Sequence, residues 1–136
     1  MLKSTPIGSL AAALLLAGAL LLNSGCEVIS SGAVVGTRAV NKTFTNQGDL
    51  TATLCGDYDS IVRQTHGAIG LLSLNIPDEQ NQEPIDTFNT SDANGNPIRI
   101  VITRIDKGTC QVSIHYGDHG SEYYSRNVLA AIQKSA

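Results

Sequence analysis

Apolar and polar side chains alternate over residues 50–54 (LTATL), and the alternation ends at Gly56. A period of two predicts a β-strand with one buried face, because successive side chains of a strand point to opposite sides. From residue 58 the apolar positions instead recur every three or four residues, which predicts an amphipathic helix over residues 58–70. Asp57 precedes this helix and is a favourable N-cap, since its carboxylate can accept from amides of the first turn.

The rest of the chain predicts four more strands and a closing helix. A polar turn is expected over residues 78–84, and the Asn-Gly pair and the proline of residues 92–97 predict a hairpin turn. The closing helix follows Ser121, a second favourable N-cap, and carries apolar side chains at helical spacing. The four strands are expected over residues 72–76, 85–90, 98–105 and 110–116.

These elements define an α+β fold in the order β-α-β-β-β-β-α. Strands joined by short turns run antiparallel, so we expect an antiparallel sheet of about five strands with two helices on one face. Ile100 should then be buried beneath the helices. The opposite face includes Thr51, Thr53, Arg99 and Thr103. We expect it to stay uncovered and to be the working surface.

The N-terminal segment has a different character. Residues 4–25 contain no charged side chain and follow Lys3. A basic start, an apolar stretch and small residues at its end are typical of a secretory signal peptide. Because about 20 apolar residues can span a bilayer, a retained membrane helix is one alternative, and secretion without an anchor is another. Ser24 and Gly25 before Cys26 favour cleavage, since signal peptidases require small residues at the scissile bond.

The end of this segment, LLLNSGCEV, resembles the lipobox of bacterial lipoproteins, with Asn23 where Leu is usual. The resemblance implies that the thiol of Cys26 receives a diacylglyceryl group, that the chain is cut before it, and that the new N-terminus is acylated with a fatty acid such as palmitate. It also implies sorting to the outer membrane, facing the periplasm, because Glu27 rather than aspartate follows the cysteine. The residues that match the lipobox are Leu22, Ser24, Gly25 and Cys26.

The expected organisation has three parts. Residues 1–25 are the signal peptide, residues 26–46 are the lipidated cysteine and a tether rich in small residues, and residues 47–136 are the α+β domain. Removal of residues 1–25 from the 136-residue chain leaves 111 residues, which suffice for one domain.

The charge balance limits the classes of partner. Lys3 is lost with the signal peptide, so twelve acidic residues remain against eight basic ones. A mildly acidic surface argues against binding to nucleic acid or to anionic lipid headgroups. The lipobox resemblance implies the membrane as a partner, through the lipid anchor, and we expect an envelope protein as a second partner.

Residues that could carry chemistry are few. His115, Asp118 and His119 lie close together in the sequence and could supply metal ligands, but their spacing does not place them on one face of a helix. His66 falls within the first predicted helix and is interpreted as a partly buried helix residue. We expect no catalytic site, no metal and no cofactor. Binding of a metal or small ligand through His115, Asp118 and His119 is the alternative.

The three cysteines raise the question of a disulfide. If Cys26 is acylated, Cys55 and Cys110 remain, and an oxidising compartment favours their pairing. Strand parity places Cys110 on the core face and Cys55 on the other, whereas a disulfide needs converging Cβ atoms. Because Cys55 borders Gly56, where the backbone can turn, the Cys55–Cys110 disulfide stays a candidate.

A second resemblance concerns the whole domain. The segment VSIHYGDHGSEYYSRNVLAAI, residues 112–132, resembles the closing strand and helix of a family of small bacterial lipoproteins of unknown function, and LTATLCGDYDSIV resembles that family's first strand and helix start. The matching positions are Gly117, Gly120, Ser125, Arg126, Leu129 and Ile132. The resemblance implies a compact envelope domain and brings no catalytic residue. The sequence thus predicts a lipid-anchored envelope lipoprotein with a structural or protein-binding role.

Overall fold

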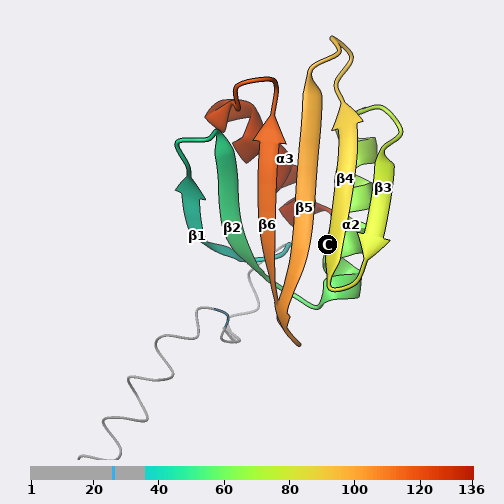
Figure 1. The fold of residues 1–136 in the computed structure, drawn as a ribbon. Coiled ribbons are helices and arrows are strands. Elements are labelled where there is room, and N and C mark those ends of the chain that lie inside the picture. Colours follow the sequence, from blue (N-terminus) through green and yellow to red (C-terminus); the bar gives the residue numbers. More distant parts are fainter. Residues whose placement is uncertain (1–25, 27–35) are drawn as a thin grey trace, which may run out of the picture. The chain divides into compact units, whose positions relative to one another are not determined.

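The computed structural model describes Cys26 and residues 36–136. The predicted signal peptide and the part of the predicted tether between residues 27 and 35 lie outside the described residues. The described chain forms a six-stranded antiparallel sheet with two helices on one face (Figure 1). The strands are β1 (Ala39–Phe44), β2 (Asp49–Cys55), β3 (Asp78–Gln82), β4 (Ile85–Ser91), β5 (Pro97–Asp106) and β6 (Thr109–Tyr116), and the helices are α2 (Tyr58–Leu71) and α3 (Glu122–Lys134).

The sheet has the strand order β1-β2-β6-β5-β4-β3, and every neighbouring pair is antiparallel. The α+β class and the two helices on one face are as the sequence predicts. None of the helices in the described part of the chain is long and apolar enough to cross a membrane.

Alternating side chains of the central strands form the core. Ile100 and Ile102 of β5 are fully buried, whereas Arg99 is exposed and Thr103 is partly exposed, so the predicted register of this strand is confirmed. β5 pairs with β6 so that Ile100 lies beside Ile114 on the buried face. α2 and α3 pack on this face and against each other, which removes the apolar side chains of both layers from water.

Both helices begin at the residues expected from the sequence. The side chain of Asp57 accepts from the backbone N–H of Ser60, and that of Ser121 accepts from the N–H of Tyr124. The hydrogen bonds from Ser60 lower the pKa of Asp57 below its usual value. Each cap satisfies a donor that the first turn of a helix leaves unpaired.

The first difference from the sequence prediction is β1. Residues 39–44 were expected in the tether, but they form an edge strand paired with β2, with an irregular register between Val40 and Thr43. Thr37, which precedes β1, is held against both helices. It exchanges hydrogen bonds with Gln133 near the end of α3, and the side-chain amide of Gln64 in α2 donates to the hydroxyl of Thr37. The domain therefore begins before residue 47.

The second difference lies between α2 and β4. Residues 72–76 alternate like a strand, yet the structure leaves them irregular, with Leu74 packed on the core and Ile76 fully exposed. The polar stretch Asp78–Gln82, expected as a turn, is instead strand β3 at the other edge of the sheet. The backbone ladder to β4 holds this strand, so it needs no apolar alternation.

The candidate disulfide between Cys55 and Cys110 is absent. Cys110 is a free thiol, fully buried under the helices, where burial raises its pKa to about 11. It pairs across the strands with Leu54, so its side chain shares the core face, whereas Cys55 is the next residue and points to the other face. The turn at Gly56 does not rotate Cys55 to the core face, where it could bond to Cys110.

Candidate functional site

The face of the sheet away from the helices is the surface that the sequence singles out. A row of short side chains crosses the strands of this face. Its members, each beside the next, are Thr51 of β2, Ser113 of β6, Val101 of β5 and Thr87 of β4. All four are partly exposed. The predicted surface residues Thr53, Arg99 and Thr103 lie on this same face. We refer to it as the uncovered face.

A charged group occupies one end of the uncovered face. His115 Nδ1 lies 2.9 Å from Asp49 Oδ1, and an Arg99 guanidinium nitrogen lies 3.9 Å from the same oxygen. Asp118 and His119 are exposed in the turn after β6, and Asp118 lines a shallow hollow of about 300 Å³ together with Arg99 and His115. In the chain described, no three His, Cys, Asp or Glu residues gather as metal ligands would.

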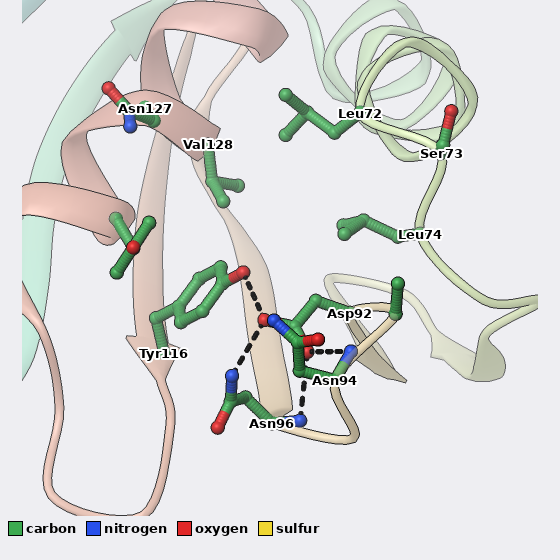
Figure 2. Close-up of a pocket in the computed structure, with 11 residues that line it drawn as sticks. Leu72, Ser73, Leu74, Asp92, Asn94, Asn96, Tyr116, Asn127 and Val128 are labelled. Atoms are coloured by element: carbon green, nitrogen blue, oxygen red, sulfur yellow. Dashed lines mark hydrogen bonds between the residues drawn. The ribbon is translucent and has the colours of Figure 1, made fainter.

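A larger pocket, of about 430 Å³, lies on the helical side of the sheet, and no residue of it was expected from the sequence to be functional. It opens between the end of α2, the turn from β4 to β5, the end of β6 and the start of α3 (Figure 2). The lining residues are Leu72, Ser73, Leu74, Asp92, Ala93, Asn94, Asn96, Tyr116, Tyr124, Asn127 and Val128.

Asp92 organises the turn that forms one wall of this pocket. Its Oδ1 accepts from the backbone N–H groups of Asn94 and Asn96, and its Oδ2 accepts from the side-chain amide of Asn96 and from the hydroxyl of Tyr116 at 2.7 Å (Figure 2). These hydrogen bonds, led by that from the Asn96 side chain, lower the pKa of Asp92 to about 2. The carboxylate is therefore ionised throughout the physiological pH range.

Aromatic rings form the wall of the pocket beside Asp92. Tyr116 and Tyr124 are stacked, with centroids 5.0 Å apart, and Tyr123 meets Tyr124 edge-on. Burial, with the hydrogen bond to Asp92, raises the pKa of Tyr116 to about 12, so its hydroxyl stays a donor. Tyr123 and Tyr124 are both more than half exposed, which leaves aromatic surface at the rim.

A second unexpected feature is a buried acid near the β3 edge. Asp86 of β4 is completely buried, and no donor group in the described part of the chain supplies a hydrogen bond to either carboxylate oxygen. Burial raises its pKa to about 7, and the carboxylate of Glu79 adds to the rise. Glu79 itself lies 3.0 Å from His66 of α2, whose ring meets Phe88 edge-on. His66, expected to be partly buried, is instead exposed, and its contact with Glu79 joins α2 to the edge strand.

Sequence patterns revealed neither the pocket at Asp92 nor the buried acid Asp86. Asp92 lies in a stretch that reads as an ordinary hairpin turn, and Tyr116 joins it only because β6 ends beside that turn, 24 residues later. One signal for Asp86 was present: it occupies an inward position of a strand, where an acid is unusual.

The cysteines have different states. Cys26 and Cys55 are each disulfide-bonded in the structure, whereas Cys110 is a free thiol. The lipid attachment expected at Cys26 stays a prediction.

The fold and its surfaces define a small α+β domain with one layer of helices on one sheet. The chain belongs to the family described as "Protein of unknown function (DUF3568)", whose model matches residues 9–135. The match includes most of the apolar N-terminal segment and all of the described domain except its last residue. Among curated proteins, none matches the chain.

Proposed function

We propose that this chain is a lipid-anchored protein of the bacterial cell envelope whose α+β domain binds a partner protein and catalyses no reaction. The anchor is the lipidated Cys26, in the outer membrane facing the periplasm. The observation that carries the binding role is the uncovered face, where four antiparallel strands present a continuous row of partly exposed side chains.

The anchor rests on the residues around Cys26 and on membrane physics. The uncharged run over residues 4–25 ends in Ser24 and Gly25, directly before Cys26, as a lipoprotein precursor requires. The family match begins at residue 9, inside this run. Each buried methylene contributes about 0.8 kcal/mol, so a diacylglyceryl group and a third acyl chain hold a protein firmly where one chain holds it marginally.

Lipidation and a disulfide exclude each other at Cys26, because a thioether and a disulfide would use the same sulfur. Since Cys26 is disulfide-bonded in the structure, the proposal requires that acylation, rather than oxidation, takes this thiol in the cell. The state of Cys26 can be measured directly.

The uncovered face suits a protein partner for two reasons. Thr51, Val101 and Thr87 are β-branched, so their side chains lose little conformational freedom when a partner covers them. The Asp49–His115–Arg99 group at one end of the row adds charges of both signs, which can fix the orientation of a partner.

Introduction of a positive charge at the centre of the uncovered face tests the proposal. In Ser113→Lys the ammonium stands between Thr51 and Val101, where a docked partner would bury it, and burial of an unpaired charge is costly. Gln47→Lys adds the same charge in the exposed turn before β2 and is the matched control. Chemical cross-linking in intact cells should give a discrete heteromeric product for the wild type and for Gln47→Lys, and this product should be lost in Ser113→Lys.

Circular dichroism must show that both variants remain folded. A cross-linked product that survives equally in both variants would show that the uncovered face is not the binding surface.

A further inference from the structure

The pocket between the ends of the two helices has a charge that no neighbouring group neutralises. Asp92 is the only charged residue among the described residues that line it, and it takes part in none of the ion pairs of the described chain. Its hydrogen bonds come from neutral donors, two backbone N–H groups, one amide and one phenol. They stabilise the carboxylate without cancelling its negative charge.

The remaining walls combine apolar and aromatic side chains with uncharged polar ones. Leu72, just after α2, and Val128 of α3 lie on the side of the pocket away from the turn, and Leu74 lies nearer the turn (Figure 2). The stacked rings of Tyr116 and Tyr124 continue this surface. Electron-rich ring faces attract cations, and a carboxylate beside them reinforces the preference.

The pocket is held in shape before any ligand arrives. Asn75, just after α2, bonds the turn through its backbone N–H to Ser91 and through its side chain to Ser91 and Asp92. The hydroxyl of Thr90 donates to the carbonyl of Asn75 at 2.5 Å. The end of α2 and the turn at Asp92 are thereby locked together, and a preformed site binds with a smaller ordering cost.

We infer that this pocket binds a cationic group on an apolar stem, an ammonium or guanidinium whose charge lies near Asp92 and whose hydrocarbon part packs on Leu72 and Val128. Its volume of about 430 Å³ fits a small molecule or one long basic side chain. The same chemistry is offered by a free aliphatic amine and by a lysine or arginine of a peptide. This site is separate from the uncovered face, so it stands or fails independently of the proposed function.

A series of three probes of equal length and different charge tests the inference on the full chain in an uncharged detergent. The probes are pentylammonium, pentanol and pentanoate. Tyrosine fluorescence reports binding, because the chain has no tryptophan and three of its four tyrosines lie at or beside the pocket. Pentylammonium should give a saturable change, pentanol should bind at least about tenfold more weakly, and pentanoate should not bind. Equal binding of the amine and the alcohol would overturn the inference.

Variants locate the site. Asp92→Asn should weaken pentylammonium binding by at least about tenfold, and Tyr124→Leu, which keeps an apolar wall, should weaken it to a smaller extent. Asp78→Asn removes the same charge at an exposed position of β3, outside the pocket, and should bind as the wild type does. If Asp92→Asn disturbs the turn, the probe series on the wild type and the Tyr124→Leu variant still show whether the pocket binds a cation. Unchanged binding in a folded Asp92→Asn variant would refute the assignment.

The source of the cation follows from one further comparison. A blocked Ala-Lys-Ala tripeptide presents the same ammonium on a peptide backbone. Tighter binding of the tripeptide than of pentylammonium supports a basic side chain of a partner, and tighter binding of the free amine supports a small-molecule ligand. Failure of both to bind would contradict the inference.

Discussion

Asp86 shows how one residue can make stability depend on pH. It lies on an inward position of β4, fully buried, with Glu79 of β3 and Tyr58 of α2 as titratable neighbours. Burial favours the neutral form of this carboxyl, and a side-chain hydrogen bond with Glu79 and the negative charge of Glu79 favour it further. The folded chain thus holds a proton at pH values where the unfolded chain has released it.

The sign of the pH effect follows from the two pKa values. The pKa of Asp86 is 3.8 when unperturbed and about 7 in the folded chain. Below pH 3.8 both states are protonated and Asp86 carries no penalty. As the pH rises towards 7, only the unfolded state ionises, so the free energy of unfolding falls. Above pH 7 the penalty is fully present.

Asp86→Asn should remove this penalty. The amide has nearly the same shape and does not ionise, so we expect the variant to be more stable than the wild type at pH 8 and its stability to change less between pH 4 and pH 7. Urea unfolding at several pH values measures both quantities. Asp78→Asn, which changes an exposed acid on β3, is the control and should keep the wild-type slope. An identical slope in Asp86→Asn and the wild type would contradict the assignment.

The two faces of β5 should respond differently to truncation. Ile100→Ala removes fully buried methyl and methylene groups and should lower the free energy of unfolding by about 2–5 kcal/mol. Thr103→Ala, on the uncovered face of the same strand, should cost less than about 1 kcal/mol. Urea denaturation gives both values. Losses of similar size would mean that a second layer covers the uncovered face.

At the scale of elements, the two edge strands are what sequence patterns miss. The sequence predicts the central strands well because they are half buried, and burial imposes the alternation that is read along β2, β5 and β6. β3, with the sequence DEQNQ, has only Glu79 partly buried, so backbone pairing with β4 alone makes it a strand. In β1 the irregular register hides the period.

A contact between two turns joins the β1 edge to the rest of the domain. Gly48, before β2, and Gly120, before α3, pack backbone against backbone, and both have positive φ, +88° and +81°. A Cβ on Gly120 would meet the carbonyl oxygen, carbon and Cα of Gly48, which are main-chain atoms and cannot move aside. This contact fixes the turn that closes the β1–β2 hairpin against the turn that starts α3.

Gly120→Ala tests this contact, and Gly95→Ala is its control. Gly95 has a similar φ of +84° but nothing within 4 Å of an added Cβ, so its substitution should cost only the backbone term of about 1–2 kcal/mol. Gly120→Ala adds the steric clash and should lower the free energy of unfolding further. Thermal or urea unfolding compares the two. Equal losses would show that the turns separate without cost.

At the scale of the whole molecule, the α+β class, both helices, their N-caps and four of the strands are predictable from the sequence. The candidate sites are harder to predict from the sequence than the fold is. The uncovered face follows from alternation, because each outward position is the neighbour of an inward one. The pocket needs the end of α2, Asp92, Tyr116 and the start of α3 to meet, and only the tertiary fold determines that meeting.

The states of the cysteines also concern the whole molecule. The alternation of side chains along the strands predicts Cys110 in the core and argues against its pairing with Cys55, and in the structure Cys110 is a buried free thiol. The state of Cys26 decides how the molecule is held in the cell, because a lipid anchor and a disulfide at this residue are alternatives.

The mass of the N-terminal peptide of the protein, extracted from bacterial membranes and analysed without reduction, tests the central claim most directly. A lipid-anchored protein gives a peptide that begins at Cys26, with a diacylglyceryl thioether on its sulfur and an acyl chain on its amino group. A peptide that begins before residue 26, or one in which Cys26 is unlipidated and joined to another cysteine, would contradict the anchor.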